Sequence, residues 1–137
     1  MNHIIQTKQL EYRNGKYYYR GKCWTPNQPV KLGKNKANKW GEVLAVVGDQ
    51  ARLVRFGSNQ HEQNRNYVRW KSYWSRFNGH RRDQIKAHGK YYALRPLFWS
   101  DAVLWSPKSR HTTAIKDKAF LRKVDSYQLF TRKFGVL

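Results

Sequence analysis

The sequence predicts an α+β fold in which two N-terminal β-hairpins form a small antiparallel sheet and amphipathic, aromatic-rich helices follow. Three patterns indicate this class. An Asn-Gly pair stands at 14–15, two Val/Leu-rich runs flank Gly48-Asp49-Gln50, and helical periodicity begins at Asn59. Asn-Gly and short glycine-containing links are typical of hairpin turns. Apolar residues spaced by three and four are typical of a helix that faces a core.

The two hairpins are predicted over 10–24 and 40–57. The residues between them, 25–39, combine two prolines and a glycine with repeated lysines and few large apolar groups. This composition predicts a basic loop or arm. Cys23 is the only cysteine, so no internal disulfide is expected, and a small buried side chain is its predicted role.

The first helix is predicted to bury rings and display arginines. At about 100° per residue, one arc of roughly 80° carries Tyr67, Trp70, Trp74 and Phe77. The opposite side carries Arg65, Arg69 and Arg76, with Ser72 beside them. Asn78-Gly79 is a typical stop signal, so the helix is expected to end there.

The C-terminal half predicts further short helices. A helix is expected to end at Gly89 and to be followed by extended chain over 91–94. A second helix is expected to begin at Pro96, to place Phe98, Ala102 and Trp105 on one face, and to stop at Pro107. A third is expected over 114–124, capped by Thr112 or Thr113. The tail from 126 to 137 fits no single pattern.

Length and charge indicate one basic domain over 1–137 that binds a polyanion. Lysine and arginine number 28 against 8 acidic residues, which gives a formal charge of +20. Self-repulsion on this scale is relieved when nucleic acid neutralises it. Aromatic residues make up 15% of the chain, which argues for a packed core and against disorder.

The patterns that carry catalysis or metal binding are absent from the sequence. The eight acidic residues are scattered singly, and neither a zinc-ligand spacing nor a Gly-rich phosphate loop occurs. We therefore expect no cofactor, no metal and no enzymatic activity. No apolar run approaches the roughly 20 residues of a membrane span, and the first residues lack the apolar core of a signal peptide.

The predicted interface consists of cations, which contact phosphates, and of exposed rings, which stack on unpaired bases. The cations are Lys31, Lys34, Lys36, Lys39, Arg65, Arg69, Arg76, Arg81, Arg82, Lys108 and Arg110. The rings are Tyr18 and Tyr91, because one ring of each tyrosine run should be exposed on a strand. The alternatives are an ordinary solvated face for the arginines and a core role for the rings.

Two short blocks resemble a known family. Residues 54–57 read VRFG and 97–105 read LFWSDAVLW, an order that resembles small basic proteins of double-stranded DNA phages and giant DNA viruses. The matching residues are Phe56, Gly57, Arg65, Phe98, Trp99, Ser100, Leu104 and Trp105. The Arg-His pair of that family's helix has no clear counterpart here. The resemblance implies a viral origin and carries no catalytic assignment.

Together these observations predict a non-enzymatic, virus-encoded virion component, located in the virion or the host cytoplasm. It would contact capsid protein and genome, and its partner would be double-stranded DNA bound without regard to sequence. The alternatives are a regulatory factor that binds nucleic acid or a polymerase during infection, and, less favoured, a metal-dependent nuclease. The sequence leaves the choice between DNA and RNA open.

Overall fold

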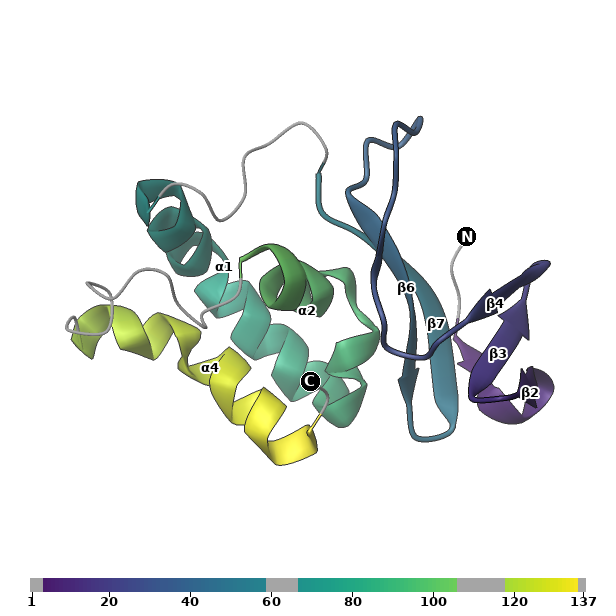
Figure 1. Ribbon diagram of the computed structural model, residues 1–137. Coiled ribbons are helices and arrows are strands. Elements are labelled where there is room, and N and C mark those ends of the chain that lie inside the picture. The colour runs from purple at the N-terminus through teal and green to yellow at the C-terminus, as the bar shows by residue number, and fades with distance from the viewer. Residues whose placement is uncertain (1–3, 59–66, 106–117, 136–137) are drawn as a thin grey trace.

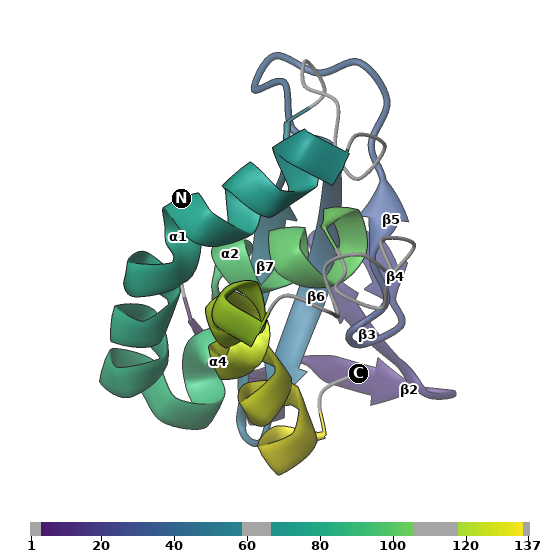
Figure 2. The same cartoon turned by 90° about the vertical axis from the view of Figure 1, so that its left-hand side faces the viewer.

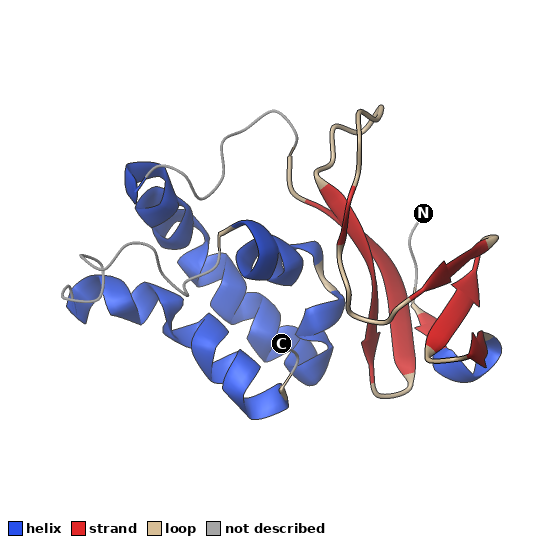
Figure 3. Cartoon of the chain, viewed as in Figure 1, coloured by secondary structure: helices blue, strands red, loops and turns tan. Residues whose placement is uncertain are grey.

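The computed structural model of the protein describes residues 4–58, 67–105 and 118–135. Helices lie on one side of a central sheet and a small β-meander lies on the other, as Figure 1 shows. Figure 3 colours helices blue and strands red, and the short 3₁₀ helix η1 (Thr7–Gln9) lies on the strand side, beside the meander. Antiparallel hairpins precede the helices along the chain, so the predicted α+β class is confirmed.

The first predicted hairpin is part of a three-stranded meander. Its strands are β2 (Glu11–Arg13), β3 (Lys16–Tyr19) and β4 (Lys22–Trp24). Asn14 and Gly15 have φ angles of 53° and 77°, as a tight two-residue hairpin turn requires. Arg20 and Gly21 repeat this geometry at 51° and 75° and add β4, a turn that the sequence analysis did not predict.

Cys23 on β4 is exposed, so its predicted burial is wrong. Side chains alternate between the two faces of a strand. Trp24, the next residue, takes the inward position and is buried, which leaves Cys23 on the outer face.

The second predicted hairpin is confirmed as the centre of a four-stranded antiparallel sheet. The strand order is β1 (Ile5–Gln6), β7 (Gln50–Phe56), β6 (Gly41–Val47) and β5 (Val30–Lys31). Val47 pairs with Gln50, so Gly48 and Asp49 alone make the turn.

The β6–β7 hairpin is buried on both faces because it forms the middle layer. One face contributes Val43, Ala45, Val54 and Phe56 to the large aromatic cluster under the helices. The other face contributes Leu44, Ala51 and Leu53 to a smaller cluster that Trp24 covers from the meander. Burial on both faces explains the apolar run Val43–Val47 of β6, whereas β7 also carries Arg52 and Arg55.

The lysine-rich segment 25–39 is not a free arm: Val30–Lys31 forms the edge strand β5, and the loops on either side of it are held by hydrogen bonds. Asn27 donates from its side-chain amide to the Val46 carbonyl at 3.0 Å and accepts from the Val46 amide at 2.8 Å. Further along, Asn35 donates to the Gly33 and Lys39 carbonyls at 2.8 and 2.9 Å. These bonds hold the two loops in defined turns on either side of β5.

Helix α1 (Tyr67–His88) buries Trp70 and Trp74, as predicted. The predicted stop at Asn78-Gly79 is wrong, because the helix continues for another nine residues after Gly79. A glycine inside a helix costs only about 1 kcal/mol, and the turns beyond it bury Arg81, which pairs with Asp101. Gly89, at φ +54°, follows the final residue of the helix.

The chain returns from α1 to the sheet through the 3₁₀ helix η2 (Gly89–Leu94). Extended chain over 91–94 was expected, and this prediction is wrong. A strand would turn alternate residues to opposite faces, whereas η2 buries Tyr92, Ala93 and Leu94 in succession and packs on β6.

Pro96 begins α2 (Pro96–Trp99) at the first helical position, as predicted. The chain then widens into η3 (Ser100–Leu104), a π-helical turn in which the Trp105 amide donates to the Ser100 carbonyl at 3.1 Å.

Because of this wider turn, the residues of the segment that face the core differ from those predicted by α-helical spacing. Phe98 is buried as expected, but Ala102 and Trp105 are only half-buried. Asp101 and Leu104 occupy the buried positions in their place.

Helix α4 (Lys118–Phe134) runs beside α1, as Figure 2 shows from the helical side. It buries Val124, Tyr127 and Phe130 and covers most of the tail, to which the sequence had assigned no structure. The predicted stop at Pro107 and the predicted caps Thr112 and Thr113 lie outside the described residues. None of the described helices combines the length and the apolar composition that crossing a membrane requires.

Candidate functional site

The outer side of α1 places two of the predicted arginines at the mouth of a pocket. Arg69 and Arg76 are exposed, two turns apart, with exposed Ser72 between them. The Arg76 guanidinium lies 5.4 Å from the centre of the Phe77 ring. Arg65, the third residue of the predicted stripe, lies outside the described residues.

The pocket has a volume of about 490 Å³. It lies between α1, the α2–η3 segment and the end of β7. Its lining residues are Gly57, Ser58, Val68, Arg69, Ser72, Tyr73, Arg76, Phe77, Leu97, Ser100, Leu104 and Trp105. Apolar and aromatic side chains thus form most of the wall, with two arginines and three serines among them.

A pair of stacked rings forms part of this wall. The Tyr73 and Trp105 rings are parallel within 7°, with centroids 4.4 Å apart. The Tyr73 hydroxyl donates a 2.6 Å hydrogen bond to Oδ1 of Asp101, which lies at the start of η3. Burial, followed by the nearby Asp101 carboxylate, raises the pKa of Tyr73, so this hydroxyl stays protonated and remains a donor.

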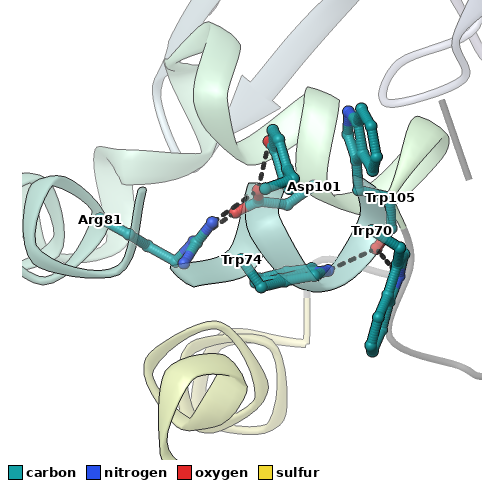
Figure 4. Close-up of polar contacts among 6 residues, drawn as sticks. Trp70, Trp74, Arg81, Asp101 and Trp105 are labelled. Carbon is teal, nitrogen blue, oxygen red and sulfur yellow. Dashed lines mark hydrogen bonds and ion pairs between the residues drawn. The ribbon is translucent and has the colours of Figure 1, made fainter. Parts of the chain in front are cut away.

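Arg81 was predicted to contact nucleic acid, and this prediction is wrong. Its side chain is fully buried, and its Nε and Nη2 donate to the two Asp101 carboxylate oxygens at 2.6 and 3.0 Å (Figure 4). Its guanidinium also lies 4.2 Å from the centre of the Trp74 ring. Arg81 follows Trp74 by seven residues, so it shares the buried face. The helical spacing of Trp70 and Trp74, continued beyond Gly79, predicts a buried position for Arg81.

The ionisation of the buried pair follows from their contact. Burial alone disfavours charge on either group, and it raises the pKa of Asp101. Burial lowers the pKa of Arg81, whereas the hydrogen bonds and the charge of the Asp101 carboxylate raise it. The net effect is a raised pKa for Arg81. The guanidinium therefore remains charged in the core.

A second polar contact ties η3 to α1. The indole N–H groups of Trp70 and Trp74 both donate to the Trp105 carbonyl, at 3.0 and 2.8 Å (Figure 4). The segment that carries the family resemblance is thus held to α1 at Asp101 and at Trp105. Neither partner could be paired from the sequence, because no local pattern links α1 to η3.

The Arg-Phe-Gly block meets the same segment from the other side. Gly57 has a φ angle of +76°, and a Cβ there would overlap the Leu104 side chain and lie 3.0 Å from Cβ of Trp40. Phe56, Phe98 and Trp99 are fully buried. Most of the residues that match the viral family therefore have a packing role. Gly57, Ser100 and Trp105 also line the pocket.

In Figure 2 the lysine loop and the first turns of α1 both lie toward the top of the view, whereas Figure 1 shows the loop above the sheet and these turns at the far edge of the helical layer. Lys31, Lys34 and Lys36 are exposed, and Lys39 is half-buried. The loop rejoins the sheet at Trp40, beside Gly57 at the edge of the pocket.

Of the remaining predicted residues, Arg82, Tyr18 and Tyr91 do not line the pocket. Arg82 is exposed on α1, and Lys108 and Arg110 lie outside the described residues. Tyr18 is 36% exposed on the meander, but the Arg13 guanidinium covers its ring at 4.6 Å. Tyr91 is half-buried in η2, and its hydroxyl donates to Asp49 at 3.3 Å.

Among the described residues, no group of three or more His, Cys, Asp or Glu side chains is placed to hold a metal ion. Comparison of the chain with family models, curated proteins and solved structures finds no match.

Proposed function

We propose that the chain is a non-enzymatic, virus-encoded protein that binds nucleic acid through its phosphates and serves as a particle component between capsid protein and genome. The observation that carries the binding is the exposure of cations in two segments. Arg69 and Arg76 are exposed on α1 and line the pocket, and Lys31, Lys34 and Lys36 are exposed in the segment that rejoins the sheet at Trp40, beside Gly57.

The physical reason is the release of counterions from the nucleic acid. A chain of formal charge +20 gains affinity whenever a phosphate replaces solvent beside an exposed cation. Such contacts position the protein without reading bases. We therefore expect binding that tolerates any duplex sequence.

The viral part of the proposal depends on the resemblance of 54–57 and 97–105 to small basic proteins of DNA phages and giant DNA viruses. Those residues pack at the junction of β7, α1 and η3. The resemblance therefore supports a shared architecture and a viral origin, and it adds no catalytic role.

The test is the salt dependence of binding to duplex DNA. Each neutralised phosphate contributes about −0.9 to the slope of log K against log salt. We expect the double variant Arg69→Gln/Arg76→Gln to reduce the slope by about 1.8. The matched control is Arg132→Gln/Lys133→Gln, which removes two exposed charges from the end of α4 and should leave the slope nearly unchanged.

A wild-type slope shallower than about −1 would contradict binding through phosphates. An equal loss in both double variants would show that total charge matters and the α1 face does not. Quantitative mass spectrometry of the particle with which the chain copurifies tests the second half of the proposal. Many copies per particle are expected, whereas recovery with a polymerase alone would favour a regulatory factor.

A further inference from the structure

The pocket that Arg69 and Arg76 line has features that phosphate binding alone does not require. A phosphate contact needs only an exposed cation, yet here the cations border a concave site of about 490 Å³. Small-molecule sites range from about 300 to 1,000 Å³ and are lined mainly by apolar groups with a few polar ones. This pocket has both the size and the lining of such a site.

The lining indicates an occupant that is flat, aromatic and anionic. Tyr73, Phe77 and Trp105 line the pocket with rings, of which Tyr73 already contacts the other two, and Leu97 and Leu104 add apolar surface. Arg69 and Arg76 supply positive charge at the mouth. Unpaired nucleobases stack on aromatic rings and on guanidinium planes in this way, while the attached phosphate pairs with arginine.

Contacts within the protein position the Tyr73 and Trp105 part of the wall. The Tyr73 ring is held by its stack on Trp105 and by its hydrogen bond to Asp101, which Arg81 holds in turn. The Trp105 backbone is fixed by two indole donors. A buried ion pair is weak support for stability, but here it orients a pocket wall, and preorganised sites lose less entropy on binding.

We propose that this pocket binds one unpaired nucleotide of a nucleic-acid strand, with the base among Tyr73, Phe77 and Trp105 and its phosphate at Arg69 and Arg76. This inference rests on the proposed function and adds to it a preference for single-stranded regions. Bases inside a duplex are stacked on one another and cannot enter a pocket.

The first experiment removes bases from the ligand. Fluorescence anisotropy at fixed salt would compare a thymidine oligonucleotide of about ten residues with an abasic strand of equal length and charge. We expect wild-type protein to bind the thymidine strand about tenfold more tightly, the scale of one stacked base. Equal affinities would overturn the pocket proposal. Duplex binding with a steep salt slope would still stand, so the two proposals can fail separately.

The second experiment fills the pocket without disturbing the core. Ser72 is exposed on α1 and lines the pocket, so Ser72→Leu places an aliphatic group in the mouth. The control is Ala87→Leu, at an exposed α1 position that does not line the pocket. The preference for the thymidine strand should fall toward one in Ser72→Leu and persist in the control. A preference that survives Ser72→Leu and disappears in Tyr18→Leu would overturn the proposal, because it would show that the base stacks on the meander.

Competition identifies the source of the ligand. Thymidine monophosphate in excess should displace the fluorescent thymidine strand from wild-type protein more effectively than inorganic phosphate does. Equal displacement by the two would show that the base adds nothing and would overturn the proposal. An acidic aromatic peptide that displaces the strand better than the nucleotide would assign the pocket to a protein partner instead.

Discussion

At the scale of single residues, the contact between Arg81 and Asp101 shows how position overrides residue type. Both side chains are fully buried, although charged residues are rarely buried unless paired. Arg81 belongs to the cationic excess by composition but to the core by its place on α1.

Removing one partner of this pair should be far more damaging than removing both. Asp101→Ala leaves a buried guanidinium uncompensated, and we expect a loss of about 3–5 kcal/mol in the free energy of unfolding. The double variant Arg81→Met/Asp101→Leu should recover most of that loss. Urea denaturation measures both. A double variant no more stable than Asp101→Ala would mean that shape at this site matters more than charge.

At the scale of elements, α1 is notable because it passes through Asn78-Gly79 without ending. A Cβ added at Gly79 would meet nothing within 4 Å, and this residue is exposed. Local sequence favours a stop there, whereas the contacts of Arg81 with Asp101 and of Gln84 with Arg95 favour continuation.

This continuity predicts a stabilising substitution. Gly79→Ala should raise the free energy of unfolding by about 0.5–1 kcal/mol, because alanine reduces the freedom of the unfolded chain. Gly89→Ala is the matched control, since φ +54° at that position disfavours any Cβ and the variant should be destabilised. Thermal unfolding compares the two. Destabilisation by Gly79→Ala would indicate that the helix breaks at this glycine.

At the scale of the whole molecule, the protein combines an aromatic core with a surface rich in cationic side chains. Burial, reinforced by the Asp101 carboxylate, raises the pKa of Tyr73, Tyr92 and Tyr127. Below about pH 10 these tyrosines are protonated in both the folded and the unfolded state. Above it the unfolded state releases protons that the folded state retains.

Stability should therefore be unaffected by these tyrosines below about pH 10 and fall at higher pH, by up to about 1.4 kcal/mol per pH unit for each one. Tyrosinate absorbance should rise in two phases, the second coinciding with loss of the circular dichroism of the helices. A single phase in which every tyrosine ionises while the helices persist would contradict the burial of these three rings.

Local chemistry in the sequence determined the α+β class, the two hairpins and the ring-bearing face of α1. The Asn14-Gly15 turn follows from residues that tolerate positive φ angles, and burial of Trp70 and Trp74 follows from helical spacing. These patterns act within a few residues, so they can be recognised without knowing what each element packs against.

Only the tertiary structure decided which cations face the solvent and where a pocket forms. The pocket joins Gly57 at the end of β7, the outer side of α1 and the π-helical turn before Trp105, segments with no local sequence relation. The burial of Arg81 depends in the same way on Asp101, twenty residues further along the chain. Contacts of this kind depend on how the elements pack, which residue periodicity within any one element does not specify.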